Sequence, residues 1–137
     1  MPALSQTLKF TTGNPPGKSA SVIYPQATRG LQTFLSDPVK SDGYYGGDGL
    51  HTVTYIPWTE QPANTFIYNN FGGSIVMQAT LELSPTELDW FDIDGTYTEF
   101  TRTHHANTFH NFRGIYVWIR AKVEISEGVL SQILYNH

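Results

Sequence analysis

The strongest pattern in the sequence is a strict alternation of apolar and polar positions over residues 114–125, GIYVWIRAKVEI. The apolar positions are Ile115, Val117, Ile119, Ala121, Val123 and Ile125, and the positions between them are Tyr116, Trp118, Arg120, Lys122 and Glu124. Successive side chains of a β-strand point to opposite sides of a sheet, so a period of two is typical of a strand with one dry and one wet face. The pattern therefore predicts a long β-strand rather than a helix.

A second long strand is predicted over residues 74–83, where the same alternation recurs. Its dry face would hold Ile75, Met77, Ala79, Leu81 and Leu83, and Val76 is the one apolar residue on its wet face. Two long strands of this kind can bury their apolar faces only against each other or against similar sheets. The sequence therefore predicts an all-β protein, an antiparallel β-sandwich or jelly-roll-like fold.

Shorter alternating runs predict the remaining strands of a single domain spanning residues 1–137. Residues 1–40 contain weakly patterned short runs at 4–12, 21–24 and 31–35, which predict an N-terminal arm that either edges the sandwich or reaches to a neighbour. Residues 41–137 predict the core, with further strands at 51–56, 65–68, 89–93, 96–103, 107–112 and 129–135. The last of these is apolar on both faces, which predicts an inner strand or one covered by a partner chain.

Glycine, proline and capping residues predict where these strands are interrupted. Four of the nine residues from Ser41 to Gly49 are glycine, which predicts a loop. Ser84-Pro85-Thr86-Glu87 matches a capping box with Ser84 as the N-cap, which predicts at most one helical turn. Asp94-Gly95 predicts a tight turn.

Net charge, cysteine content and the first ten residues limit which partners and which cellular compartment are expected. The formal net charge is −4 and the eight Lys and Arg residues are scattered, so we expect no binding to nucleic acid and no membrane insertion. The absence of cysteine excludes disulfides and thiolate chemistry and fits synthesis in a reducing cytoplasm. The first ten residues, MPALSQTLKF, lack the features of a signal peptide, so a route other than secretion is expected for any role outside a cell.

Three groups of residues resemble parts of catalytic or metal sites. His104, His105 and His110 could contribute to a metal site, but adjacent strand residues point to opposite faces, which favours solvated loop histidines. Asp92-Ile93-Asp94-Gly95 matches only the start of a calcium loop, and turn geometry explains it as well. No strained G-x-S-x-G elbow or separable carboxylate pair occurs. We therefore expect no enzymatic activity, no cofactor and no metal.

Aromatic residues suggest two kinds of binding surface. Tyr116, Trp118 and Arg120 share the wet face of the long strand, and such residues are enriched at protein interfaces. The alternative is that the N-terminal arm of the same chain covers them. Leu130 and Leu134, on one face of the last strand, are further interface candidates. Tyr44, Tyr45 and Trp58 could stack on a sugar ring, or the loop that carries the two tyrosines could fold back over the sandwich.

Several of these segments together resemble β-sandwich structural proteins of tailed bacteriophage virions, in particular small ones of cyanophages. The residues that carry the resemblance are Gly73, Val76, Gln78, Ala79 and Leu81, Trp90 and Ile93, Phe112, Gly114, Trp118, Arg120 and Ala121, and Gly128, Leu130 and Ile133. It spans residues 41–137, including the segment DGYYGGDGLHTVTY, and brings no catalytic residue with it.

The resemblance implies a non-enzymatic virion protein that binds other virion proteins and itself, as a homo-oligomer. It would be made in the host cytoplasm and located in a tail, neck, fibre or capsid decoration. The alternative is a carbohydrate-binding module that contacts a host surface glycan at the tip of a fibre.

Overall fold

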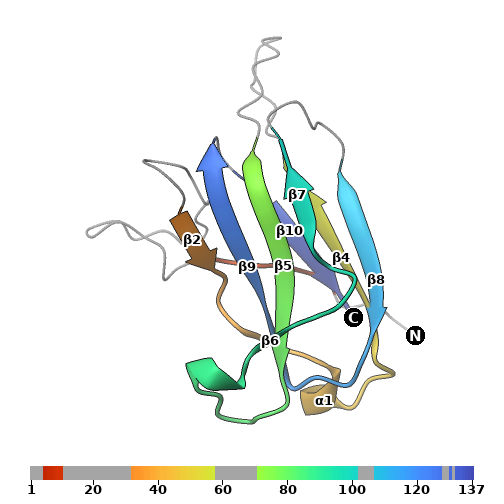
Figure 1. Cartoon of the computed structure of the whole chain (residues 1–137). Helices are drawn as coiled ribbons and strands as arrows, with labels where there is room; N and C mark the ends of the chain where they lie inside the picture. Colours follow the sequence, from red (N-terminus) through yellow and green to blue (C-terminus); the bar gives the residue numbers. More distant parts are fainter. Residues whose placement is uncertain (1–4, 11–31, 58–70, 102–106, 128–129, 131) are drawn as a thin grey trace.

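The computed structural model describes residues 5–10, 32–57, 71–101, 107–127, 130 and 132–137. Two antiparallel sheets pack face to face and enclose one hydrophobic core (Figure 1). The predicted all-β sandwich is therefore confirmed. In the described part of the chain, no helix is long and apolar enough to cross a membrane.

One sheet has four strands in the order β1-β10-β4-β8. Its strands are β1 (Ser5–Thr7), β10 (Gln132–Asn136), β4 (Leu50–Ile56) and β8 (Thr108–Arg113). The last strand, β10, lies between β1 and β4, with Tyr135 opposite Val53. Its apolar residues on both faces are thus those of an inner strand, which is the first of the two predicted explanations.

The other sheet has six strands built around the long pair β5 and β9. Its strands are β2 (Gln32–Leu35), β3 (Val39–Lys40), β5 (Gly72–Thr80), β6 (Phe91–Asp92), β7 (Thr98–Phe100) and β9 (Trp118–Glu127). β9 pairs with β5 on one side and with β2 and β3 on the other, while β6 and β7 both pair with β5. The two strands with the clearest sequence pattern are therefore the centre of this sheet.

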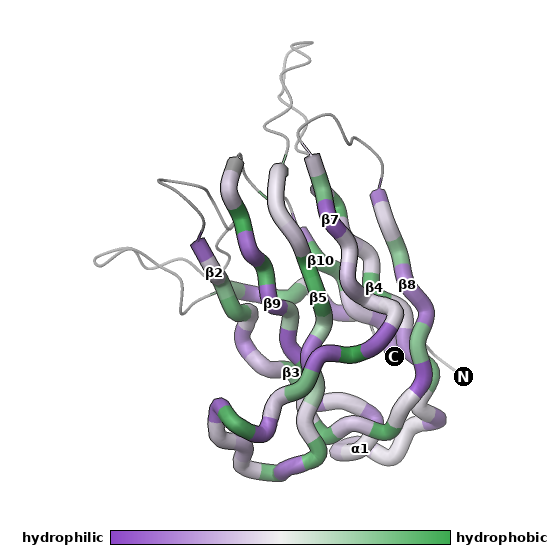
Figure 2. The backbone as a smooth tube through the Cα atoms, in the orientation of Figure 1, coloured by the Kyte–Doolittle hydropathy of each residue, from purple (hydrophilic) through white to green (hydrophobic). Residues whose placement is uncertain are grey.

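The core lies between the sheets and takes alternate side chains from both. Its fully buried members include Val53, Tyr55, Ile133 and Tyr135 from the four-stranded sheet, and Ile75, Met77, Ala79, Ile119, Ala121, Val123 and Ile125 from the six-stranded sheet. Figure 2 shows hydrophobic positions recurring along the central strands of both sheets. Burying a valine, isoleucine or methionine side chain stabilises a fold by about 1.5–3 kcal/mol, so the period-two pattern carries the main driving force for folding.

The described part of the predicted N-terminal arm forms edges of both sheets. β1 extends the four-stranded sheet beside β10, and β2 and β3 extend the six-stranded sheet beside β9. Leu8 and Phe10, which follow β1, are buried in the core. These residues therefore edge the sandwich, which is one of the two predicted alternatives; the predicted run at 21–24 and the one at 65–68 lie outside the described residues.

The N-terminal third of the predicted strand 114–125 departs from the prediction. β9 begins at Trp118, Val117 is half-buried, and Ile115 is 54% exposed. Residues 114–117 connect β8 in one sheet to β9 in the other. Gly114 N donates to Gly49 O in the loop before β4, and Val117 N donates to Thr80 O at the end of β5. A segment that crosses between the sheets cannot point alternate side chains into the layer between them, so the prediction was wrong for Ile115.

The predicted strand 74–83 ends earlier, at Thr80. Leu81 and Leu83 are 61% and 69% exposed instead of lying in the core. Glu82 N donates to Thr80 Oγ1 at 3.2 Å, a short-range bond that accompanies the departure of the chain from the sheet. The alternation therefore continues in the sequence to Leu83, although the strand ends at Thr80.

The segment that follows β5 covers the predicted wet face of the sheet. We name residues 81–92 the leucine segment, after Leu81, Leu83 and Leu88. Beneath it, Gln78, Thr80 and Arg120 are buried although the alternation places them on the wet face. The wet face of the two central strands is thus partly dry, because the chain folds back over it.

The described part of the chain contains two single helical turns. One lies in a segment predicted as a loop, and the other is the predicted turn with a different capping residue. Asp42–Tyr45 forms α1, which ends at Gly46 in the left-handed conformation at φ 83°, so the predicted loop contains a helical turn. Glu87–Asp89 forms the 3-10 helix η1, and its capping box is Thr86 with Asp89. A single turn is confirmed there, but the cap lies two residues after the predicted Ser84, because Thr86 and Asp89 complete the reciprocal bonds.

Two of the later predicted strands are present in shortened form, while a third matches closely. The predicted strand 89–93 is reduced to Phe91–Asp92. Of the predicted strand 96–103, residues 96–101 are described, and within them the strand spans Thr98–Phe100. Between them, Asp94 and Gly95 form the predicted turn, with Gly95 at φ 82°. The prediction at 107–112 corresponds to β8 with a shift of one residue.

Candidate functional site

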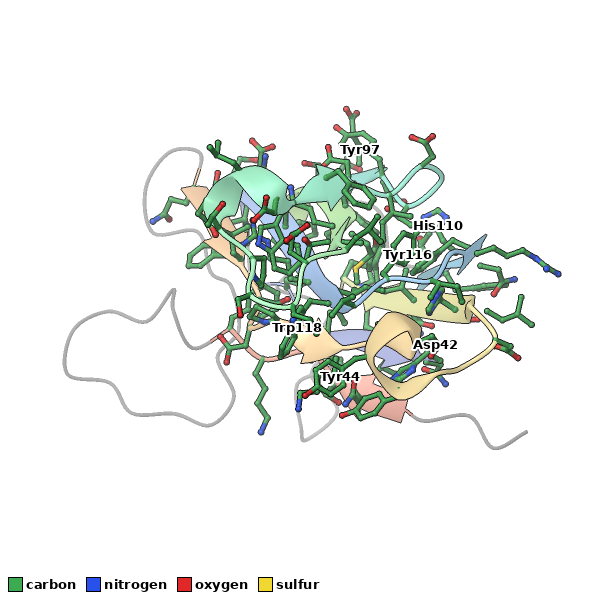
Figure 3. The ribbon with its side chains drawn as sticks, turned by 90° about the horizontal axis from the view of Figure 1, so that it is seen from below. Asp42, Tyr44, Tyr97, His110, Tyr116 and Trp118 are labelled. Carbon is green, nitrogen blue, oxygen red and sulfur yellow. The ribbon has the colours of Figure 1, made fainter. Side chains whose placement is uncertain are left out.

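A cluster of buried polar groups closes one end of the sandwich, beside α1. We name it the buried polar cluster; its members are Ser41, Asp42, His51, Tyr135 and His137. They come from the start of α1, from β4 and from the end of β10, which the fold brings together. Figure 3 shows Asp42 at one side of the α1 turn, with Tyr44 beside Trp118 at the other.

One line of hydrogen bonds in the cluster runs through Tyr135 and His51. Ser41 Oγ lies 2.6 Å from Tyr135 Oη, Tyr135 Oη lies 2.8 Å from His51 Nδ1, and His51 Nε2 lies 2.6 Å from Gly114 O. A carbonyl oxygen only accepts, so His51 donates from Nε2 and accepts from Tyr135 at Nδ1. Tyr135 in turn accepts from Ser41. Every polar group in this line thus has a partner when His51 is neutral.

A second set of bonds centres on the carboxylate of Asp42. Its Oδ1 accepts from His137 Nδ1 at 2.8 Å and its Oδ2 accepts from Gly49 N at 2.8 Å, and the side chains of Asp42 and His137 are each only 4% exposed. Burial alone would raise the pKa of Asp42, but the hydrogen bonds from His137 and Gly49 outweigh it and hold that pKa below its ordinary value. Asp42 is therefore ionised at neutral pH and ties α1 to the end of β10.

The rings around this cluster form a stack. Phe112, His51, Tyr135, His137 and Tyr45 follow one another with centroid separations of 4.9, 5.8, 4.9 and 6.3 Å and interplanar angles of 21° or less. Offset stacking of this kind adds to the burial of the rings. The stack runs from the buried Phe112 to the exposed Tyr45, so it joins the core to the surface.

A groove of about 660 Å³ lies beside the cluster. It is lined by Leu50, His51, Thr52, Asn111, Phe112, Arg113, Asn136 and His137. Amide and guanidinium groups at its wall suit hydrogen bonding to a polar ligand. His137 Nε2 is buried and has no hydrogen-bond partner among the described residues.

The buried polar cluster makes stability depend on pH through His51. Burial lowers the pKa of His51, and this outweighs the bond to Gly114 and the charge of Asp42, which raise it. The unfolded chain takes up a proton near the ordinary value of 6.5, where the folded chain still leaves His51 neutral. The contribution of His51 to stability is therefore fully present above pH 6.5 and is lost as the pH falls from 6.5 toward the lower pKa of the folded state.

We predict that the urea concentration at the midpoint of unfolding decreases as the pH is lowered from about 7 to about 5. His51→Gln should make this decrease with pH smaller. Glutamine can accept from Tyr135 and donate to Gly114, but it does not titrate. Burial also lowers the pKa of His110, so His110→Gln is the matched control. It should remove only the part of the pH dependence that comes from His110. A slope that His51→Gln leaves unchanged would show that His51 does not titrate as argued.

The three residues predicted as a contact face are engaged by their own chain. Tyr116 is half-buried and packs edge-on against Phe91 at 5.9 Å. Trp118 Nε1 donates to Leu83 O at 2.9 Å. Arg120 is buried, and both Trp118 and Arg120 are covered by their own chain. The prediction that the N-terminal arm forms this cover was wrong, because the contacts come from the leucine segment.

Arg120 is the residue that fastens the leucine segment to the sheet. Its Nε donates to Gln78 Oε1 at 2.9 Å and its Nη1 to Glu87 Oε2 at 3.1 Å. Its guanidinium lies 4.2 Å from the ring centre of Trp90, within the range of a cation–π interaction. A planar group with several donors can make all three contacts at once.

The other predicted contact residues are divided between the core and the surface. Leu130 precedes β10 and is fully buried in the core, so its side chain is not available to a partner. Leu134 is half-buried and alternates with the core residues Ile133 and Tyr135, so the prediction that Leu130 and Leu134 share one face was wrong. Tyr44 and Tyr45 are exposed, and their contact with sugar stays a prediction. Trp58 lies outside the described residues.

The predicted metal candidates are only partly described. His110 Nε2 lies 2.6 Å from Thr98 Oγ1, and His104 and His105 lie outside the described residues. Asp92 Oδ1 accepts from Gln78 Nε2 at 2.9 Å. Among the residues that the structure describes, no group of three or more His, Asp or Glu side chains is arranged to hold a metal ion.

Sequence reasoning missed both the leucine segment and the buried polar cluster. Asp42 and His137 are 95 positions apart, and no local pattern links them. For the leucine segment there was a signal: Pro85 interrupts any strand that continues past Leu83. Comparison with known proteins identified no matching family model, curated protein or solved structure.

Proposed function

We propose that this chain is a non-enzymatic structural protein of a tailed bacteriophage virion that assembles through protein–protein contacts. The proposal joins two arguments. The resemblance of the strand motifs to phage β-sandwich proteins suggests the virion, and the surface of the leucine segment suggests how the protein works. Its partners would be other virion proteins and further copies of itself.

The observation that carries the proposal is the exposure of three leucines within eight residues. Leu81, Leu83 and Leu88 are 61%, 69% and 94% exposed. An exposed leucine is ordinary by itself, but several in one short segment beside other exposed apolar side chains are typical of an interaction surface. Phe91, at the end of the segment, is also exposed.

The leucine segment is held in a defined shape before any partner binds. Trp118 bonds to the carbonyl of Leu83, Arg120 bonds to Glu87, and the capping box joins Thr86 to Asp89. Anchoring at these points lowers the conformational entropy that is lost on binding. A preorganised apolar surface on a stable sandwich fits a structural part that binds by docking.

The second candidate is a glycan-binding module, favoured by Tyr45. Its exposed ring stacks on His137, which lines the groove together with Asn111, Arg113 and Asn136. An aromatic ring beside amide and guanidinium groups suits a sugar, whose apolar face stacks while its hydroxyl groups bond. This candidate places the ligand at the α1 end of the groove.

Localisation in purified particles tests the proposal. We expect the chain in particles of a phage that encodes it, at a fixed copy number and at one position after antibody labelling and electron microscopy. Recovery of the chain only outside the particles would overturn the proposal. On a glycan array, a signal that is lost in Tyr45→Ala and kept in Tyr97→Ala, another exposed tyrosine, would favour the second candidate instead.

A further inference from the structure

The leucine segment and the turn that follows it carry charge of one sign only. Residues 81–94 contain five of the twelve acidic residues of the chain and no Lys or Arg. The acidic residues are Glu82, Glu87, Asp89, Asp92 and Asp94. All except the half-buried Asp89 are exposed, so exposed acidic residues are interspersed with the exposed leucines along the chain.

Two cations near the leucine segment, Arg120 and Lys40, are already engaged by other side chains. Arg120 pairs with Glu87 at 3.1 Å and is itself buried. Lys40 lies over the ring of Tyr44 at 4.2 Å, with the ring of Trp118 at 6.0 Å. Asp89 and Asp92 are used by bonds to Thr86 and Gln78, which are neutral partners. The surface around the leucines therefore remains negative at neutral pH.

We propose that the leucine segment docks a basic amphipathic segment of another protein, whose apolar side covers the leucines while its Lys or Arg residues meet the carboxylates. This rests on the proposed function only in taking the segment to be a docking surface. A second copy of this chain is disfavoured there, because a symmetric contact between two leucine segments would set acidic residues against acidic residues. Copies would have to associate through other surfaces.

The test uses the whole chain and two synthetic peptides that share one amphipathic leucine pattern. The first peptide has lysine at its polar positions and the second has glutamate. We expect the lysine peptide to bind and the glutamate peptide not to bind, measured by fluorescence anisotropy. Raising the salt from about 0.1 M to about 1 M, where the Debye length falls from about 10 Å to about 3 Å, should weaken binding of the lysine peptide.

Matched variants locate the site. Leu83→Ser together with Leu88→Ser should weaken binding of the lysine peptide by about tenfold or more. Phe109→Ser, which removes another exposed apolar side chain from β8, should leave binding of the lysine peptide unchanged. Glu82→Gln with Asp94→Asn should weaken binding and reduce its salt dependence, whereas Asp48→Asn, near α1, should not. Unchanged melting temperatures would show that these exposed substitutions leave the fold intact.

Three outcomes overturn the inference. Equal binding of both peptides would remove the role of charge. Binding of the lysine peptide that the leucine variants do not affect would reduce the interaction to non-specific attraction. Self-association that the leucine variants abolish would make a second copy the occupant. Failure here while the chain is found in particles overturns only the chemistry of the partner, whereas absence from particles overturns the proposed function.

Discussion

Replacing Gly73 with alanine is expected to destabilise the protein by about 3 kcal/mol, more than a typical surface substitution. A β-carbon at this position would lie 2.0 Å from Glu124 O and 2.9 Å from Ile125 Cα. Both are backbone atoms of β9, the strand that pairs with β5 over nine register positions. They cannot move away without opening the central ladder. The pairing register also shifts between Gly72 and Gly73, which is typical of a β-bulge.

The matched control for Gly73 is Gly95→Ala. Gly95 has a positive φ of 82°, but a β-carbon there would meet nothing within 4 Å. This substitution should cost only the conformational strain of the left-handed region, about 1 kcal/mol. Urea unfolding followed by circular dichroism measures both. Equal costs for the two alanine variants would show that backbone conformation, rather than the contact with β9, decides the effect at Gly73.

Replacing Asp42 with alanine is expected to cost about 3 kcal/mol at neutral pH. The substitution leaves Gly49 N and His137 Nδ1 without their acceptor at a position where both Asp42 and His137 are 4% exposed. It also releases α1 from the end of β10. Asp42→Asn should cost less, because the amide oxygen still accepts one of these two bonds.

The pH dependence of this effect follows from the lowered pKa of Asp42. The carboxylate contributes stability at pH values above its ordinary pKa of 3.8, and this contribution is lost as the pH falls through the still lower folded pKa. The difference between the natural protein and Asp42→Ala should therefore shrink in acid. Asp48→Ala, which removes an exposed acceptor of Leu50 N, is the control and should cost less than about 1 kcal/mol. A cost as small as this for Asp42→Ala would contradict the structural role of the cluster.

The strands were predicted correctly in the parts of β5 and β9 that pair with neighbouring strands on both sides. Alternation in β5 and β9 correctly placed Ile75, Met77, Ile119 and Val123 in the core. It failed at Leu81 and Ile115 because both lie outside the sheet. Leu81 follows the end of β5 at Thr80, and Ile115 precedes the start of β9 at Trp118. Periodicity reports which residues could share a face, but it does not report how far the partner strand extends.

The candidate sites were less accessible to sequence reasoning than the strands. Arg120 stands at a wet position of β9, and only the return of the leucine segment over the sheet makes it buried. Tyr45 and His137 are stacked although nothing in the chain between them indicates contact. Such contacts depend on loops and strand ends, whose paths are set by hydrogen bonds between distant residues.

The sequence by itself determined the class of fold, because alternating apolar residues in two long segments leave an antiparallel sandwich as the way to bury them. The tertiary structure alone decided which polar residues are buried and which leucines are exposed. The physical reason is that alternation is a property of neighbouring residues, whereas burial depends on what the rest of the chain places on top of them. For this protein, that cover is the leucine segment over Arg120 and α1 over the buried polar cluster.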